Sequence, residues 1–236
     1  MRLTEYRAEQ NTITRQVVAA VVGTLRSLIG VPLNADQWRL LLSGLLPAML
    51  QGRRASHLLA VRFVTEQREL FTTTAPPTLD VPPYDVAALD ALLTRTVRAR
   101  LAVPDTARAG ITAAARAAVR HVEQAGRDTV ITATERDPAA LGWARVPTST
   151  QPCAFCWMLA SRGPVYGARE AAGAMTDWHD GCLCRVVTVY DPATWEGRDT
   201  YQAASRLWEQ TTIGHSGRDA LNAFRRALHA NPITLP

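Results

Sequence analysis

The residues best suited to bind a ligand are four cysteines and one histidine in a single stretch. All four cysteines of the 236-residue chain lie between positions 153 and 184. Together with the histidine among them, the five donors are Cys153, Cys156, His179, Cys182 and Cys184. Two cysteines separated by two residues can turn both thiolates toward one ion, and the His-x2-Cys-x-Cys run can supply the other ligands after the chain returns. The stretch therefore predicts a tetrahedral zinc site, with five donors for about four positions.

The spacing leaves open which four donors bind. Cys182 and Cys184 are two residues apart, so on a strand they would face the same side. Two disulfides and unliganded buried thiols are the alternative interpretations. Zinc is favoured because the chain starts without the apolar segment of a signal peptide, so we expect synthesis in the cytoplasm, where thiols stay reduced. Asp177 and Asp180 are the expected hydrogen-bond partners of the metal-binding histidine.

The charge of the chain restricts its partners only weakly. All 26 basic residues are arginine, the net charge is +5 and the isoelectric point is 9.4. This balance allows contact with an acidic surface, including DNA, but the arginines are scattered and favour a solvated surface. The sequence contains no apolar run of the roughly 20 residues that a membrane span needs, so we expect no membrane partner.

The N-terminal half reads as helices. Apolar residues at helical spacing predict helices over residues 12–29, 35–46 and 55–71, in an antiparallel three-helix arrangement, with Pro47 ending or kinking the second. Two Pro-Pro pairs predict an extended connector over residues 74–84. A helix over residues 85–101 and an alanine-rich helix from Pro104 to about Thr134 follow.

The pattern changes at Gly142. Strands are expected at Trp143–Val146 and Arg185–Tyr190, with a helix starting near the first cysteine pair and Val165-Tyr166 extended. Residues 200–210 and 216–230 read as amphipathic helices. The fold class is therefore mainly α: a helical N-terminal part, a small zinc-stabilised α/β module and C-terminal helices. The expected divisions are a helical bundle at residues 1–73, a connector at 74–84 and long helices at 85–137. The zinc module at 138–192 and the C-terminal helices at 193–236 follow.

A second arrangement of residues could instead form a zinc-dependent nucleobase deaminase. Such enzymes carry H-x-E and P-C-x-x-C motifs, in which the histidine and cysteines bind zinc and the glutamate transfers protons. The chain has His121-Val122-Glu123 and Pro152-Cys153-Ala154-Phe155-Cys156. This hypothesis places the first motif inside the alanine-rich helix and leaves the later donors unused. A lone His57 among apolar residues is interpreted as structural.

The cysteine stretch also resembles a known family. The runs Pro152–Tyr166 and His179–Val187, with Gly142-Trp143-Ala144-Arg145-Val146 before them, are similar to the C-terminal module of phage minor head proteins related to the F protein of phage Mu. Relatives of this type occur in phages of actinobacteria. The similarity covers about residues 139–190, whereas the N-terminal helices agree only in general character.

The resemblance implies a low-copy capsid component near the portal, built into the head during assembly in the host cytoplasm and retained in the virion. Its implied partners are the portal protein, the major capsid protein or both, with contact to packaged DNA also allowed. Some relatives are labelled capsid maturation proteases, but no nucleophile with a base and no open metal position is evident here. We therefore expect a structural role rather than an enzyme. The capsid maturation protease is the first alternative and the deaminase the second.

Overall fold

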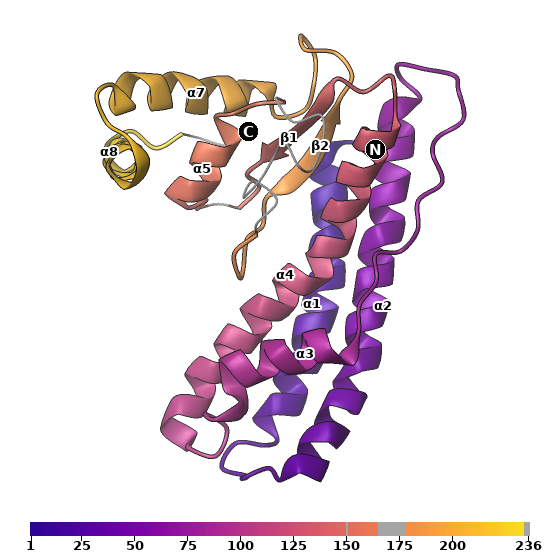
Figure 1. Cartoon of the computed structure of the whole chain (residues 1–236), viewed down its shortest axis with the longest axis vertical. Coiled ribbons are helices and arrows are strands. Elements are labelled where there is room, and N and C mark those ends of the chain that lie inside the picture. The colour runs from indigo at the N-terminus through magenta and orange to yellow at the C-terminus, as the bar shows by residue number, and fades with distance from the viewer. Residues whose placement is uncertain (150, 165–177, 234–236) are drawn as a thin grey trace.

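The computed structural model describes residues 1–149, 151–164 and 178–233. It consists of a long helical body and, at one end of that body, a small α/β module with two further helices (Figure 1). The expected fold class is confirmed. In the described part of the chain, no helix combines the length and apolar character needed to cross a membrane.

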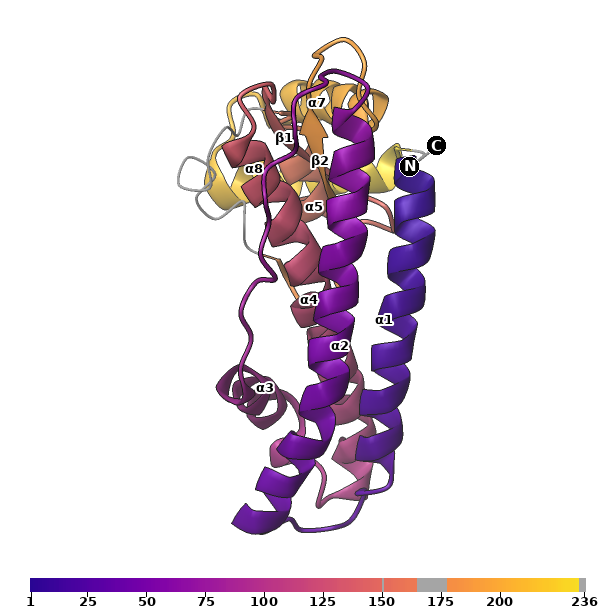
Figure 2. The same ribbon diagram turned by 90° about the vertical axis from the view of Figure 1, so that its right-hand side faces the viewer.

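Three long helices form the body: α1 (Leu3–Arg26), α2 (Ala35–Arg68) and α4 (Pro104–Arg136). They lie side by side in both views of the ribbon (Figures 1 and 2). The α2 helix starts where the sequence predicts, because the Asn34 side chain accepts a hydrogen bond from the backbone N–H of Gln37 at 2.9 Å. Pro104 occupies the first turn of α4, where its missing N–H costs nothing.

The α2 helix is longer than expected. The sequence predicts one helix stopping or bending near Pro47 and another from residue 55, but α2 runs through Pro47 without ending. Pro47 and Ser43, whose carbonyl loses its helical partner, both lie on the exposed side of the helix. Water can therefore satisfy that carbonyl, and the loss is smaller than in a buried position. The three-helix body consequently includes α4 as its third helix.

A shorter helical segment packs across the body. Residues 74–84 are extended, as predicted, and run along the outside of the body to α3 (Val86–Leu93) (Figure 2). The Asp85 side chain caps α3 by accepting from Ala88 N–H at 2.9 Å. The predicted helix over residues 85–101 continues only as a π-helical turn, η1 (Thr94–Arg98).

The module contains a two-stranded antiparallel sheet. Strand β1 (Gly142–Val146) pairs with β2 (Arg185–Val189), with Ala144 opposite Val187, so both predicted strands are confirmed. Helix α5 (Ala154–Ala160) lies between them in sequence, and α7 (Arg198–Thr212) and α8 (Gly217–Ala230) follow. These helices also agree with the sequence analysis. The extended segment expected at Val165-Tyr166 lies outside the described residues.

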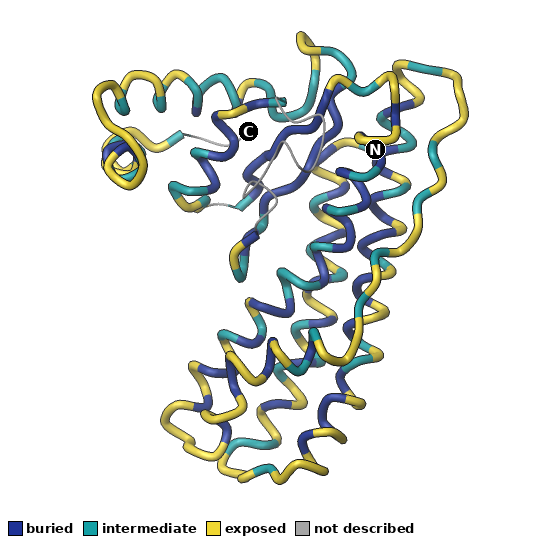
Figure 3. The backbone as a smooth tube through the Cα atoms, viewed as in Figure 1, coloured by how far each residue is buried: buried dark blue, intermediate teal, exposed yellow. Residues whose placement is uncertain are grey.

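Burial divides the interior into two main cores (Figure 3). The lower core joins α1, α2, α3 and α4, so helices from both sides of the connector share it. The upper core joins the upper ends of α1, α2 and α4 to the sheet and to three of the cysteines. A small third cluster, formed by Trp157, Ala204 and Phe224, holds α5 against α7 and α8.

Candidate metal centre

The first two donors are positioned by the start of helix α5. Cys153 is the N-cap residue, and its sulfur accepts a hydrogen bond from the Cys156 backbone N–H at 3.4 Å. Because Cys156 lies in the first helical turn, both side chains are directed toward the same space. Cys153 is exposed, whereas Cys156 is buried.

The other donors come from the segment that leads into β2. A turn closes between His179 and Cys182, where the Cys182 N–H donates to the His179 carbonyl at 3.0 Å. Gly181 adopts a positive φ of 78° in this turn, which only glycine adopts without strain. The Gly181 N–H also donates to the Arg116 carbonyl of α4 at 3.0 Å, so the turn rests on the helical body.

The donor atoms converge. His179 Nε2 lies 3.4 Å from Cys153 Sγ and 3.3 Å from Cys156 Sγ, and Cys156 Sγ lies 3.7 Å from Cys182 Sγ. Zinc bonded to sulfur at about 2.3 Å and to nitrogen at about 2.0 Å holds tetrahedral donors roughly 3.5–3.8 Å apart. The observed separations are close to those values, so the residues fit a zinc ion.

The structure brings all five predicted donors together but groups them in two ways. Cys153, Cys156 and His179 have donor atoms within 4.8 Å of one another, and so do Cys156, Cys182 and Cys184. Cys156 belongs to both groups and lies at the centre of the site. All four cysteines are free, and the 3.7 Å between Cys156 and Cys182 exceeds a disulfide bond of about 2.05 Å.

Two of the thiols are set up to ionise, as metal ligands must be. A hydrogen bond from the Cys156 thiol, followed by the neighbouring His179, lowers the pKa of Cys153 to about 5. Hydrogen bonds from Cys156 and Cys184 and the positive charge of Arg127 also lower the pKa of Cys182. Hydrogen bonds with the neighbouring cysteines and burial raise the pKa of Cys156. Against a hydrogen bond with Cys156, the neighbouring Cys182 and burial raise the pKa of Cys184, so negative charge collects on Cys153 and Cys182.

Two buried arginines, Arg127 and Arg145, lie beside this site. The guanidinium groups of Arg127 and Arg145 lie 4.2 and 3.6 Å from the centre of the Trp178 ring, next to His179. Arg127 also donates to the Cys184 carbonyl at 3.2 Å and to the Cys182 carbonyl at 2.5 Å. Burial lowers the pKa of Arg145, while the thiols of Cys184, Cys182 and Cys156 act in the opposite direction. Arg127 fixes the ligand-bearing backbone, and both guanidinium groups offset the negative charge of thiolates.

One glutamate completes the network. Glu123 accepts from Arg127 and Arg185 at 2.6 Å each and from the Thr14 hydroxyl at 3.2 Å. Glu123, Arg127 and Arg185 are each about 2% exposed or less. This buried ion network connects α1, α4 and β2. Sequence reasoning missed it, although charged residues on the apolar face of a helix and inside a Val-rich strand were the available signal.

The observed hydrogen-bond partner of His179 differs from the predicted carboxylates. The Asp180 carboxylate pairs with Arg120 at 2.7 Å and Arg95 at 3.1 Å, which lower its pKa against the effect of burial. The non-ligating His179 Nδ1 instead lies 3.3 Å from the Asp180 backbone carbonyl. Asp180 therefore anchors the turn to α4 and η1 rather than orienting the imidazole through its carboxylate. Asp177 lies outside the described residues.

The deaminase motif is not assembled around the cysteines. His121 belongs to neither donor group in the described residues, and its Nδ1 lies 3.1 Å from the Tyr84 hydroxyl. Glu123 is occupied by the two arginines. His57 has the structural role expected from the sequence: its Nδ1 lies 2.8 Å from the Thr129 hydroxyl, and burial lowers its pKa.

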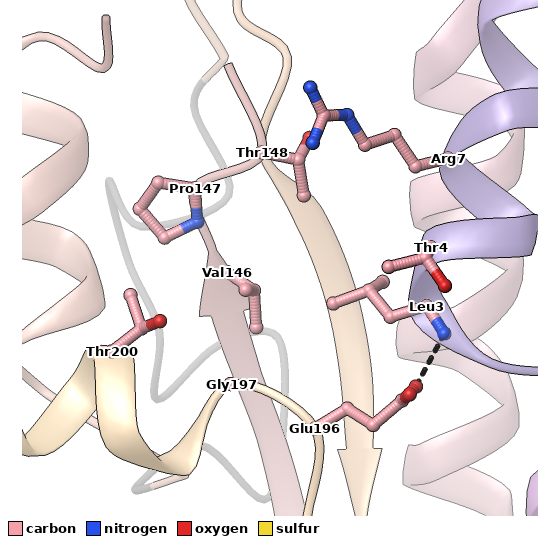
Figure 4. Close-up of a pocket in the computed structure, with 9 residues that line it drawn as sticks. All are labelled: Leu3, Thr4, Arg7, Val146, Pro147, Thr148, Glu196, Gly197 and Thr200. Atoms are coloured by element: carbon pink, nitrogen blue, oxygen red, sulfur yellow. Dashed lines mark hydrogen bonds between the residues drawn. The ribbon is translucent and has the colours of Figure 1, made fainter. Parts of the chain in front are cut away.

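A pocket separates the metal-site module from the first turn of α1 (Figure 4). It has a volume of about 200 Å³ and is lined by Thr4 and Arg7 of α1, the end of β1 and the start of α7. At one edge, the Glu196 carboxylate accepts a hydrogen bond from the Leu3 N–H at 2.5 Å, as drawn in Figure 4. This contact satisfies a free N–H at the start of α1 and attaches the module to the body.

Fold and site together define a mainly α-helical protein with a small α/β module whose cysteine and histidine cluster could hold a metal. A comparison with protein families gives the membership: the chain belongs to the family described as VG15 protein, whose model matches residues 1–211. This is a phage protein family, as its relatives show.

Two relatives are both called "Gene 15 protein". The one from Mycobacterium phage L5 is 29% identical over 287 aligned positions, which cover 100% of this chain and 98% of the relative. The one from Mycobacterium phage D29 is 33% identical over 182 positions, which cover 58% of this chain and 66% of the relative. No solved structure matches this chain.

Proposed function

We propose that this phage protein is a minor head protein that acts as a structural component during capsid assembly near the portal. Its metal is a structural zinc, held by Cys153, Cys156, His179 and either Cys182 or Cys184. Its partners are the portal protein, the major capsid protein or both, and it stays in the head of the virion. Contact with packaged DNA is compatible with its net positive charge.

The observation that carries this proposal is the meeting of the five donors in two overlapping groups, which share Cys156. A catalytic zinc site keeps a position open for water or substrate, whereas a structural site is closed by four protein ligands. Three sulfurs and one imidazole suffice for closure, and here a fourth sulfur lies beside them. The donor set therefore favours a structural ion. The family of phage proteins and the Mu F-like run of residues support the place in the head.

Zinc would supply a cross-link between two distant parts of the chain. The donor side chains of the turn at residues 179–184 meet those at the start of α5 at 3.3, 3.4 and 3.7 Å. A two-stranded sheet is marginal alone, and a structural metal adds folding free energy directly. The bound ion would make the module a rigid surface that can dock on a larger assembly.

Quantitative mass spectrometry of purified phage particles tests this role. The proposal expects the protein in mature heads at a constant low copy number, with uncut length and in the fraction that retains the portal. Absence from the particle, or recovery only from immature heads whose major capsid protein is subsequently cleaved, would contradict a structural role. The second result would favour the maturation protease.

A further inference from the structure

A groove between α1 and α4 is lined by apolar residues and arginines, none of which is a metal donor. It lies on the body where the C-terminal half of α1 passes the N-terminal half of α4, and its volume is about 720 Å³. Its apolar lining consists of Val22, Ile29, Ile111 and Ala115. Val22 and Ile29 pack against the lower core and Ile111 belongs to it, so the groove floor is an accessible edge of that core.

The rest of the groove is strongly basic. Arg26, Arg108 and Arg116 line it, all three are exposed, and no aspartate or glutamate is among the lining residues. Within the described residues, none of these arginines forms an ion pair; Arg116 donates only to the Asp180 carbonyl, at 3.4 Å. Two exposed arginines elsewhere on the body pair with acids, Arg39 with Asp36 and Arg62 with Glu9.

We propose that this groove binds an acidic amphipathic helix of a partner protein. Guanidinium groups pair with carboxylates through two parallel hydrogen bonds, and three of them border one groove. An amphipathic helix can place apolar side chains on the groove floor while its carboxylates meet the arginines at the rim. DNA phosphates could meet the arginines but would leave the apolar floor without a matching surface.

This inference goes beyond the proposed role because it names the chemistry of a partner surface. Of the groove arginines, Arg116 also donates to the Asp180 carbonyl in the metal-binding turn, so the variants below leave Arg116 unchanged. The groove belongs to the lower core, while the donors belong to the upper core and its rim. Metal analysis of each variant used below therefore separates failure of the groove from failure of the metal site. We expect full metal content in all of them.

Fluorescence anisotropy with a labelled peptide tests the groove on the full-length protein. The probe is a helical peptide of about 20 residues with leucines on one face and glutamates on the other, and its control is a scrambled peptide of equal composition. We expect the amphipathic peptide to bind at least about tenfold more tightly than the scrambled one. Equal binding of the two peptides would overturn the proposal.

Variants locate the binding. Arg26→Glu combined with Arg108→Glu should weaken binding by at least about tenfold. Arg54→Glu combined with Arg218→Glu makes the same change in net charge at exposed positions outside the groove and should change binding by less than about twofold. If both double variants weaken binding equally, the attraction is one of net charge only and the proposal fails.

Two further measurements separate a protein partner from nucleic acid. Val22→Thr keeps the side-chain shape but replaces one methyl group on the groove floor by a hydroxyl, and we expect peptide binding about threefold weaker. A labelled 20-base-pair DNA duplex should bind more weakly than the peptide at about 0.15 M salt and should be insensitive to Val22→Thr. If the DNA duplex bound more tightly than the peptide, and the Arg26 and Arg108 double variant lost that binding, the groove would be a nucleic-acid site and the proposal would be overturned.

Discussion

The lower and upper halves of this molecule are held together by different forces. The lower core is mainly aliphatic, with Trp38 as its one buried tryptophan among the described residues, and is built from residues such as Leu25, Leu45 and Leu93, which are almost fully buried. The upper core contains tryptophans and cysteines, and the buried ions Glu123, Arg127 and Arg185 lie beside it. Apolar packing stabilises a region by itself, whereas buried charges and thiols require partners to offset their desolvation. The comparison indicates a lower half stabilised by apolar packing and an upper half that depends on polar contacts and, under the proposed function, on a bound ion.

The largest effect is expected from Cys156→Ser, because Cys156 belongs to both donor groups. Structural zinc contributes on the order of 10 kcal/mol in small zinc-binding peptides, so losing it should unfold most of the module. We expect loss of the metal and of the near-ultraviolet circular dichroism of Trp143 and Trp178, with most far-ultraviolet helical signal retained.

Ala154→Ser is the matched control, since it introduces the same side chain in the same turn of α5 without removing a donor. It should keep the metal and both spectra. A Cys156→Ser protein that retains metal and unfolds as the unmodified protein does would remove the distinction between the two halves.

Next in size is the effect of Glu123→Gln. This change leaves the buried guanidinium groups of Arg127 and Arg185 without a counter-charge, and breaking one partner of a buried ion pair costs about 3–5 kcal/mol. Urea unfolding should report that loss in the free energy of unfolding. Glu9→Gln removes half of the exposed pair with Arg62 and should cost less than about 1 kcal/mol. If Glu123→Gln and Glu9→Gln lowered the free energy of unfolding equally, the buried network would not stabilise the upper half.

A change in the lower half should act through packing alone. A methyl group at Gly52 would lie 2.4 Å from Val17 Cγ2 and 3.3 Å from Val122 Cγ2, where α1, α2 and α4 meet. We expect Gly52→Ala to lower the free energy of unfolding by about 1–3 kcal/mol without changing metal content. Gly44→Ala in the same helix meets nothing within 4 Å and should stabilise by up to about 1 kcal/mol. Stabilisation by both substitutions would show that the helices are not closely packed at Gly52.

The smallest effect concerns pH and His121, which lies where the two halves meet. Burial and the adjacent Arg120 lower the pKa of His121 to about 4, so the folded protein binds fewer protons there than the unfolded chain does between about pH 6.5 and 4. Stability should therefore fall as pH falls through this window. After a reduction for partial exposure, we expect a contribution on the order of 1 kcal/mol.

Unfolding of the His121→Gln variant at pH 7.5 and pH 5 isolates this contribution. The difference in stability between the variant and the unmodified protein should shift in favour of the variant at pH 5. A constant difference across the two pH values would rule out the titration of His121 as the cause.

The sequence predicts the donors well because their identity and spacing are themselves the signal. Cys153 and Cys156, and then His179 and Cys182, are each separated by two residues, and the structure brings both pairs together. The two strands are also predictable, because β-branched residues mark β2. By contrast, the path of α2 through Pro47 depends on which side of the helix faces water, and local propensity does not contain that information.

The partners within the ion network could not be assigned from the sequence for a related reason. Glu123 and Arg127 are spaced as an ordinary surface pair on a helix, and only the docking of β2 brings Arg185 to them. Glu123 also matches a catalytic motif in the sequence, and its burial between two arginines becomes visible only in the assembled fold. Similarly, the role of Asp180 as an anchor depends on Arg95 and Arg120, which are distant in the chain.

The dependence of the upper half on a bound ion is tested most directly by measuring metal and melting on one sample. Protein purified under reducing conditions should contain about one zinc per chain, and a strong chelator should split its thermal unfolding into an early loss of the tryptophan signal and a later, unchanged loss of helix. A protein that contains no metal, and whose melting is identical with and without the chelator, would contradict the account.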